Sequence, residues 1–325
     1  MAGACLLIGD LGGTNARFAL AGSEVPGFSE YLELRCNRFA SADLAIRHYI
    51  STIGAPTPDL ICLAAAGPVI DQHVRFTNSS WSISADQLVE DFANPKVRLL
   101  NDFEAIAYSI PFLTGADCAP IGAPEPGMLA EEHYTIGIVG PGTGLGTAGL
   151  RKHGDLYIPI ASEAGHSGFA PETQVQLDIL VALRERFDRV TSERLVSGPG
   201  LENIHWALSR IQGEETPPLS APEIFTKAGD NSDSRAVEAV HLFFEILGQV
   251  AGDVALTLGA SNGIFIAGGI ARRYPQLILS SRFRSGFENK GRYRSLMKRI
   301  PTQLILHSQP GLLGAAYCAL QMSRT

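Results

Sequence analysis

The sequence predicts an α/β fold in two halves, on three observations. Strand-like apolar runs alternate with helix-like segments along the 325 residues, which is typical of sheets flanked by helices. The design of residues 8–20, an apolar run, a glycine-dense turn and a second apolar run, returns at residues 134–150. Between the two copies, residues 111–127 are rich in Pro, Gly and Ala. We therefore expect one α/β domain on each side of that stretch, from the duplication of one nucleotide-binding half.

The composition narrows the class of protein. A chain with 45% hydrophobic and 18% charged residues buries a sizeable core. Its net charge of −7 comes from 33 acidic and 26 basic residues without long runs, which argues against a nucleic-acid or membrane-surface partner. The five cysteines are scattered without a Cys-x-x-Cys pair, so neither a disulfide framework nor a cysteine zinc site is indicated. The start lacks a basic leader and no apolar stretch approaches the ~20 residues of a membrane span, so we expect a cytoplasmic protein.

The first half should begin with the hairpin of residues 8–20. Ser41 is a candidate helix cap and Gly54 a candidate helix end. The further elements that we expect are strands at 31–39, 59–70 and 96–100, and helices at 41–54, 82–93 and 104–110, the last of them stopped by Pro111.

The second half should begin with the hairpin of residues 134–150. A strand and turn at 150–160, a loop at 213–222, a long helix at 234–258 and a short strand at 263–270 follow. The tail, 310–322, starts with Pro and carries small residues at helical spacing, so it should be a helix packed closely against another element.

Two familiar nucleotide-binding patterns do not explain the glycine turns. Gly-x-x-x-x-Gly-Lys-Ser/Thr does not occur, so the lysine of that phosphate loop is missing. Gly144–Gly149 fits Gly-x-Gly-x-x-Gly, but a dinucleotide site needs a helix after the glycines, whereas residues 150–160 indicate a strand and turn. A dinucleotide site is therefore not expected.

The opening turn, GDLGGTNAR, combines bare backbone with one carboxylate. The glycines could serve only a tight hairpin that needs positive φ. Asp10 favours another interpretation, because a carboxylate beside a phosphate-facing loop repels the anion unless a cation lies between them. We expect a magnesium nucleotide there, contacted by Asp10 through water. Thr14 and Asn15 would add donors and Arg17 a positive charge.

Four further polar residues stand where a site could form. Asp102 follows a predicted strand and starts a helix, so an ionised carboxylate there could take a proton from an alcohol; the alternative is that Asn101 or Asp102 is only a helix cap. Glu163 and His166 lie three apart, and Glu193 precedes a helix. These three could be surface residues or metal ligands, but acceptor carboxylates with an imidazole also suit a polyhydroxylated ligand.

Six motifs together resemble one family. In chain order they are GDLGGTNARFAL, LNDFEAIAYSI, GPGTGLGTAGL, SEAGHSGFAP, ERLVSGPGL and FIAGGIARR. They closely resemble the bacterial hexokinase-type glucokinases of the actin-like sugar kinase superfamily, over nearly the whole chain. Ala164 stands where that family often has Gly.

The resemblance implies the architecture and the reaction. It implies two ribonuclease H-like α/β domains with a cleft between them: a small domain of residues 1–111 joined by the C-terminal helix 310–325, and a large domain of residues 112–309. It also implies transfer of phosphate from ATP, with Mg²⁺, to the 6-hydroxyl of glucose, the entry step of glycolysis, by a cytoplasmic homodimer. The cysteine-rich zinc motif of related repressors and sugar kinases is absent from the sequence.

Site residues follow from the same resemblance. Asp102 is implied as the general base, and Asn101, Glu163, His166, Glu193 and Asn78 as residues of the glucose site. The first phosphate loop would use Gly9, Asp10, Leu11, Gly12, Gly13 and Thr14. The second, within residues 140–146, would use Gly140, Gly142, Thr143 and Gly144, and Gly268 with Gly269 would form the adenosine-side turn. Two alternatives stay open: a kinase of another hexose, and a sugar- and nucleotide-binding sensor without transferase activity.

Overall fold

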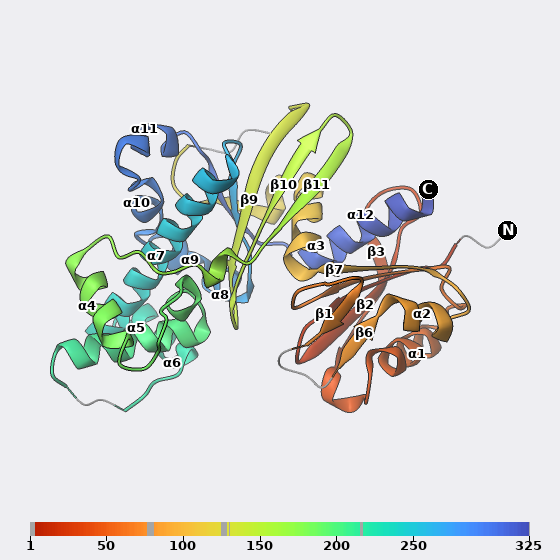
Figure 1. Ribbon diagram of the computed structural model, residues 1–325, viewed down its shortest axis with the longest axis horizontal. Helices are drawn as coiled ribbons and strands as arrows, with labels where there is room; N and C mark the ends of the chain where they lie inside the picture. Colours follow the sequence, from red (N-terminus) through yellow and green to blue (C-terminus); the bar gives the residue numbers. More distant parts are fainter. Residues whose placement is uncertain (1–3, 77–80, 125–128, 130, 215–216, 325) are drawn as a thin grey trace. The chain divides into compact units, whose positions relative to one another are not determined.

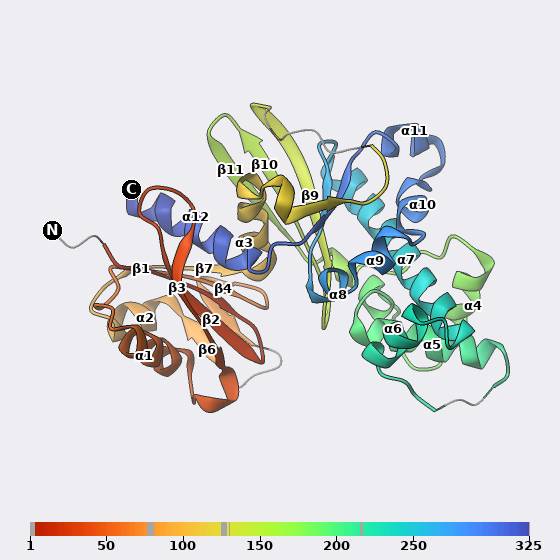
Figure 2. The same cartoon turned by 180° about the vertical axis from the view of Figure 1, so that it is seen from behind.

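The computed structural model describes residues 4–76, 81–124, 129, 131–214 and 217–324. The chain divides into two compact units, and each is described by itself (Figures 1 and 2). Residues 1–114 and 307–325 make up the first unit, and residues 115–306 the second.

The sheet of the first unit has five strands within the described residues, in the order β3-β2-β1-β4-β7. Neighbours among β3, β2 and β1 run antiparallel, whereas β1, β4 and β7 run parallel. The interior strand β4 is buried along its whole length, which explains its continuous apolar sequence. The bounds are β1 (Leu6–Leu11), β2 (Asn15–Ala21), β3 (Phe28–Arg35), β4 (Leu60–Ala65) and β7 (Lys96–Asn101).

Helices cover both faces of this sheet. Figures 1 and 2 show α1 (Ala42–Ile53) and α2 (Ala85–Asp91) on one face, and α3 (Asp102–Ser109) with α12 (Pro310–Arg324) on the other. The end of α1 at Gly54 is confirmed, because this residue adopts the left-handed conformation and donates to the carbonyl of Ile50.

Several predicted bounds in this unit are corrected. Ser82–Ser84 is not helical but forms strand β6, which pairs with β5 (His73–Arg75). The strand expected to run to residue 70 ends at Ala65, ahead of Gly67 with its φ of 136° and Pro68. The strand expected over residues 31–39 ends at Arg35 and continues as a 3-10 turn, Cys36–Arg38.

The last helix completes the core of the first unit. It packs against α3, β1 and β4, and ten of its residues are buried. A Cβ at Gly314 would overlap the carbonyl oxygen of Ala105 in α3, so the two helices approach closely only because glycine stands there. The predicted close packing of the tail is confirmed.

The sheet of the second unit repeats the topology of the first. Its order is β11-β10-β9-β12-β13-β8. An antiparallel set of three, β11, β10 and β9, continues into parallel β12 and β13, as in the first unit, and β8 adds an antiparallel edge. The bounds are β8 (Cys118–Pro120), β9 (His133–Pro141), β10 (Leu145–His153), β11 (Leu156–Ser162), β12 (Ile264–Ile266) and β13 (Thr302–Ile305). The repeated glycine-turn hairpin thus marks a repeated sheet.

The long helix α7 (Ser234–Leu258) forms the centre of the second unit. It packs against β9 and against α5 (Gly198–Ile211), α6 (Ala221–Gly229) and α10 (Phe283–Glu288). The expectation that no segment is long and apolar enough to span a membrane is wrong for α7. However, 78% of its most apolar stretch is buried inside the protein, which is typical of a core helix.

The remaining helices of this unit are short or peripheral. They are α4 (Gln174–Leu183), α8 (Gly269–Arg273), α9 (Pro275–Leu279) and α11 (Arg294–Met297).

Candidate active site

Different structural constraints act on Gly9 and Gly12, two glycines at the β1–β2 turn. The N–H of Gly12 donates to the carbonyl of Asn15 over 2.9 Å and closes the turn. A Cβ at Gly9 would lie 2.8 Å from Cδ2 of Leu63, so core packing requires glycine there. A Cβ at Gly12 would meet its nearest neighbour at an ordinary 3.5 Å, and neither glycine has a positive φ. The alternative that these glycines are needed for a hairpin turn with positive φ is therefore wrong for both residues. Neither packing nor φ explains why residue 12 is glycine.

Asp10, at the end of β1, lies between a guanidinium and the start of a helix. Arg17 Nη1 lies 3.5 Å from Oδ2 of Asp10, and its Nε donates to Glu33 over 3.0 Å. On the other side, a Cβ at Gly311 in the first turn of α12 would lie 3.2 Å from the same Oδ2. Burial raises the pKa of the Asp10 carboxyl even though the Arg17 charge opposes that shift.

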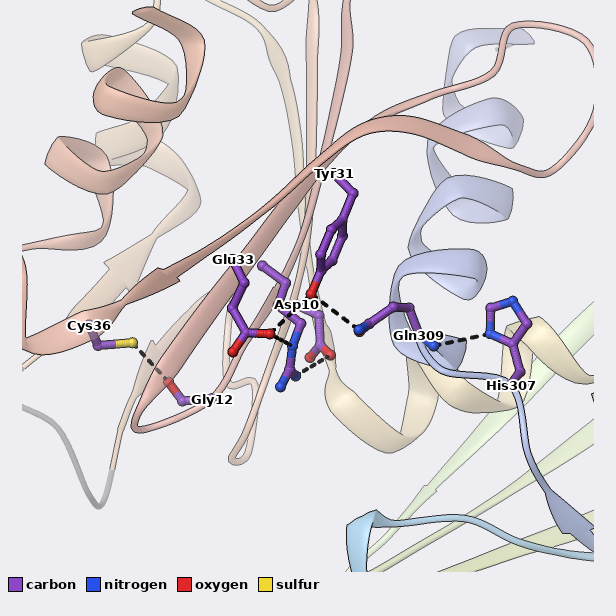
Figure 3. A network of polar contacts seen from close by, with 8 residues as sticks. Asp10, Gly12, Tyr31, Glu33, Cys36, His307 and Gln309 are labelled. Carbon is purple, nitrogen blue, oxygen red and sulfur yellow. Dashed lines mark hydrogen bonds and ion pairs between the residues drawn. The ribbon is translucent and has the colours of Figure 1, made fainter. Parts of the chain in front are cut away.

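A chain of hydrogen bonds extends from this carboxylate to the segment before α12 (Figure 3). Glu33 accepts from the hydroxyl of Tyr31 over 3.0 Å. Tyr31 in turn accepts from the side-chain amide of Gln309 over 3.2 Å, and the Gln309 N–H donates to Nδ1 of His307 over 3.1 Å. The surroundings of Asp10 are therefore tied to residues at both ends of the chain.

The donor set around Asp10 fits a magnesium ion bound with a phosphate. Mg²⁺ is usually held by one or two carboxylates, with waters and substrate phosphates completing its octahedron. Asp10 offers one carboxylate, 21% exposed, beside a turn of backbone N–H groups. Within the described ranges, no group of three or more His, Cys, Asp or Glu residues could hold a metal ion by itself. Asp10 could therefore contact Mg²⁺ through water, with the phosphates supplying direct ligands.

The parallel strands of the first unit end level with one another. Leu11 pairs with Ala65, and Ala65 pairs with Asn101, so the glycine turn, the Gly67 turn and Asn101 share one edge of the sheet. Open α/β sheets bind ligands beyond this carboxyl edge.

Asn101 and Asp102 start α3 at that edge. Oδ1 of Asn101 accepts from the N–H groups of Phe103 and Glu104 over 2.9 and 3.3 Å, and its amide donates to the carbonyl of Gly67 over 3.0 Å. The interpretation of Asn101 as a helix cap is therefore confirmed. Asp102 is half-buried, and its Oδ1 accepts from the N–H of Phe103 over 3.0 Å. The helix N-terminus favours the ionised form of this carboxyl.

The structure brings Glu163, His166 and Glu193 together in the second unit. Nε2 of His166 lies 4.0 Å from Glu163, and its Nδ1 lies 3.9 Å from Glu193. Two short turns, Ala164–His166 and Ser192–Arg194, carry these residues, and the N–H of Ser192 donates to Ser167 over 2.9 Å. The side chains of Glu163 and His166 are 64% and 61% exposed and that of Glu193 29%, so all three can reach a ligand.

The second glycine turn lies directly beside Glu193. Oε2 of Glu193 accepts from the N–H of Leu145 over 2.9 Å, and a Cβ at Gly144 would lie 2.5 Å from the same oxygen. A Cβ at Gly142 would meet no atom within 4 Å, and Gly142 has no positive φ. A side chain at position 144 would therefore displace the Glu193 carboxylate, whereas position 142 has room for a Cβ.

The start of α5 and Gly268 border the same turn. The N–H of Gly198 donates to the carbonyl of Gly142 over 2.9 Å. Gly268 has a φ of 89°, and a Cβ there would lie 2.5 Å from the carbonyl oxygen of Pro141. Gly269, which begins α8, is open to the surroundings. Asn78 lies outside the described residues.

Comparison with known proteins gives the family. A family model described as Glucokinase matches residues 7–322. The chain belongs to the glucokinase family. A glucokinase of Nitrobacter hamburgensis is 41% identical over 316 residues, which cover 97% of this chain and 97% of that protein.

Solved structures of the glucokinase family share the fold. The crystal structure of a glucokinase from an Antarctic psychrotroph is 32% identical, with a TM-score of 0.88, and the match covers 98% of this chain and 100% of that one. A ROK family glucokinase from Streptomyces griseus, solved with glucose and AMPPNP, is 19% identical, with a TM-score of 0.66 and coverage of 98% of this chain and 99% of that one, and is similar in fold alone.

Membership of the glucokinase family confirms three predictions. The resemblance to bacterial glucokinases is confirmed, as is the two-domain α/β fold class of actin-like sugar kinases. The predicted enzyme class, a kinase that phosphorylates glucose, is confirmed as well.

Two residues that matter in this glucokinase-family site were not found from the sequence. Leu145 contributes only its backbone N–H, which leaves no trace in its side chain. Position 165 requires glycine because a Cβ there would overlap the carbonyl oxygen of Leu145. The glycine therefore lets the Glu163–His166 turn pack closely against β10. The sequence shows a glycine between Glu163 and His166. It does not show the contact of this glycine with Leu145, because the two residues lie 20 positions apart.

Proposed function

We propose that this chain transfers the γ-phosphoryl group of ATP to the 6-hydroxyl of glucose, giving glucose 6-phosphate and ADP. The observation that carries the proposal is the group of Glu163, His166 and Glu193. It sets two carboxylates each within 4.0 Å of one imidazole, beside a glycine turn. A sugar site needs such acceptors, because each buried hydroxyl requires a partner.

The sugar would be held by polar side chains that bind its hydroxyls. Glu163, His166 and Glu193 of the second unit would accept from and donate to its hydroxyls, with Asn101 of the first unit and Asn78 completing the set. Asn101 is already fixed by three hydrogen bonds at the start of α3, so its remaining amide hydrogen is held in one direction. A fixed donor of this kind orients a ligand at little entropic cost.

Asp102 would act as the general base. Its position at the N-terminus of α3 favours the carboxylate form, which can take the proton from the 6-hydroxyl as the phosphoryl group is transferred. Most of the rate enhancement would come from positioning and from neutralisation of charge, because phosphoryl transfer needs little covalent help.

The two glycine turns would bind the phosphates of ATP. Gly12 and Gly142 support this role, because neither packing nor a positive φ requires glycine at these positions. The N–H groups of Gly12 and Gly142 close their own turns by donating to the carbonyls of Asn15 and Gly144. The missing Cβ atoms would instead leave room for an anion to come close to the rest of the turn backbone. Thr14 and Thr143 would add hydroxyl donors, and Gly268 with Gly269 would border the adenosine end.

Asp10 would hold Mg²⁺ through water. When bound, this ion neutralises charge on the phosphates. Arg17 keeps the carboxylate of Asp10 in place from one side and the first turn of α12 from the other.

The fold itself supports binding of both substrates at once, because a protein of this fold was solved with glucose and AMPPNP together. The proposal also includes the setting that the resemblance implies: a cytoplasmic homodimer at the entry step of glycolysis. Sedimentation or gel filtration at micromolar concentration tests the dimer.

One assay tests the reaction. ADP release is followed with Mg-ATP and glucose, mannose, fructose, N-acetylglucosamine, N-acetylmannosamine or no sugar, and the phosphate position in the product is read by NMR. We expect release that depends on glucose and yields glucose 6-phosphate. If only another sugar stimulates ADP release, glucose is not the substrate. If no sugar stimulates ADP release in a protein shown to be folded, the proposed transfer reaction is wrong.

A further inference from the structure

A cavity of about 430 Å³ lies against the first glycine turn and includes three residues that have no role so far. It is lined by Gly13 and Thr14 of the turn and by Arg35, Asn37 and Arg38. Its volume lies within the range of small-molecule sites, roughly 300–1,000 Å³. One wall is therefore the expected phosphate loop, and the other carries two arginines.

The two walls are bonded to each other through Cys36. Its N–H donates to the carbonyl of Thr14 over 2.9 Å, and its Sγ donates to the carbonyl of Gly12 over 3.3 Å (Figure 3). Asn15 and Arg35 are also paired across β2 and β3. Because Cys36 is buried and bonded to the turn, its neighbours Arg35 and Asn37 have fixed backbone positions beside the turn.

The charge of this second wall is only partly opposed within the protein, where the Arg35 charge acts on Glu33. Arg35 and Arg38 are exposed, and neither guanidinium makes a hydrogen bond or ion pair with a residue that the structure describes. The nearest acid in the sequence, Glu33, already accepts from Arg17 and Tyr31. Two positive charges therefore face the cavity beside a turn of backbone N–H groups.

This arrangement answers a question that the sequence raises. The glycine turn lacks the lysine that contacts phosphates in the familiar phosphate loop, and Arg17 is committed to Asp10 and Glu33. Phosphoryl transfer nevertheless needs cations close to the phosphates. Arginine suits that task, because its planar fork donates two parallel hydrogen bonds to a phosphate.

We propose that Arg35 and Arg38, with the side-chain amide of Asn37, bind the phosphate chain of the nucleotide received by the Gly9–Thr14 turn, and so replace the missing lysine. The inference rests on the proposed function, since that function names the nucleotide. It assigns a phosphate subsite to the end of β3 and to the 3-10 turn that follows.

The test measures nucleotide binding directly. Arg35→Gln, Arg38→Gln and the double variant are titrated with a non-hydrolysable ATP analogue and Mg²⁺ by calorimetry, without sugar. Arg151→Gln is the control, because Arg151 is an exposed strand arginine of the second unit and its loss changes the net charge equally. We expect the dissociation constant to rise about tenfold in each single variant and further in the double variant, with the control unchanged.

Three further measurements separate phosphate binding from a structural effect. Binding by the wild type should weaken with added salt more steeply than binding by the double variant, because two charge contacts are lost. Arg38→Lys should recover part of the affinity, since it restores the charge but not the fork. In steady-state assays the KM for ATP should rise while the KM for glucose stays the same.

The possible failures are distinguishable. If the double variant binds the analogue as tightly as Arg151→Gln does, with an unchanged salt dependence, the arginine subsite is wrong even in an active enzyme. If the wild type binds the analogue but phosphorylates no sugar, the proposed function fails, and the binding data still decide the role of the arginines. Circular dichroism and thermal unfolding confirm that each variant is folded.

Discussion

The carboxylate of Glu193 accepts a hydrogen bond from the backbone N–H of Leu145 over 2.9 Å. This bond joins an acid assigned to the sugar to the glycine turn assigned to the phosphates. Gly144, next in the chain to Leu145, leaves just enough room for the same carboxylate. Within the second unit, the position of the carboxylate proposed to bind the sugar therefore depends on the conformation of the turn proposed to bind phosphate.

Gly144→Ala should weaken glucose binding. Its Cβ would lie 2.5 Å from Oε2 of Glu193, so the carboxylate must move and lose the Leu145 bond. We expect the KM for glucose to rise about tenfold, the loss of one hydrogen bond to a charged group, with a smaller effect on the KM for ATP. Gly142→Ala is the matched control. It has space for the methyl group, so it should leave the KM for glucose unchanged and raise that for ATP. An equal change in the KM for glucose in both variants would contradict the proposal that only position 144 acts on Glu193.

Asp102→Asn should lower kcat by about 10²- to 10⁴-fold, the usual contribution of a general base. The amide keeps the shape of the side chain, so glucose affinity, measured by calorimetry, should change little. Turnover near the wild-type value would remove Asp102 from this role.

Asp10→Asn should raise the Mg²⁺ concentration needed for half-maximal activity. The amide cannot supply the negative charge that holds a hydrated cation, whereas the phosphates still bind it directly. Binding of Mn²⁺ with ADP, followed by electron paramagnetic resonance, gives a readout independent of turnover. Glu33→Gln, which alters the other carboxylate bonded to Arg17, is the control. An equal change in both variants would mean that the Arg17 network, and not a metal contact of Asp10, is being measured.

Gly314→Ala should destabilise the first unit. The added methyl group would overlap the carbonyl oxygen of Ala105, so α12 and α3 must separate, which typically costs about 1–3 kcal/mol in a packed core. Gly27→Ala is the control, because no atom lies within 4 Å of its Cβ position and its φ is not positive. Chemical denaturation measures the difference, and equal stability of the two variants would contradict the close helix contact.

Glu104→Gln should flatten the dependence of stability on pH in mild acid. Burial raises the pKa of Glu104 above its ordinary 4.5, against the opposing charge of Arg98. The folded protein therefore binds the proton more tightly than the unfolded chain does, and this contribution is fully present below pH 4.5 and lost as the pH rises through the raised pKa. The free energy of unfolding of the wild type, relative to the Gln variant, should accordingly fall as the pH rises from 4.5 toward neutrality. A difference that stays constant over this range would rule out the shift.

The sequence was most informative where a signal is local. Ser41, Gly54 and Pro310 mark helix ends that the structure has within a residue or two, because capping and φ preferences act over one turn. The repeated glycine-turn hairpin likewise predicted a repeated sheet. The segment 82–93 was misjudged because its first three residues pair with His73–Arg75, a partner that no helical period reveals.

Contacts between distant segments could not be foreseen in the same way. Asp10 and Gly311 lie 301 positions apart in the sequence yet pack against each other. The arginines beside the first glycine turn come from the end of β3 and from the 3-10 turn after it, and they match no familiar motif. Asn101 shows a different limit, because the competing interpretations were a helix cap and a sugar ligand. The structure shows the cap, with the Asn101 amide donating to Gly67. The role in sugar binding stays a prediction.

The composition of the first unit from residues 1–114 and 307–325 has a consequence for synthesis. On the ribosome, β1, β4 and α3 emerge early, but the helix that covers them is translated only after residues 115–306. The second unit is contiguous and can complete its core first, although domains usually finish in order from the N-terminus. The faces of β1 and β4 that α12 covers in the folded protein therefore stay exposed to solvent during most of translation. If translation stalls before α12, the N-terminal segment is the part of the nascent chain most prone to aggregate.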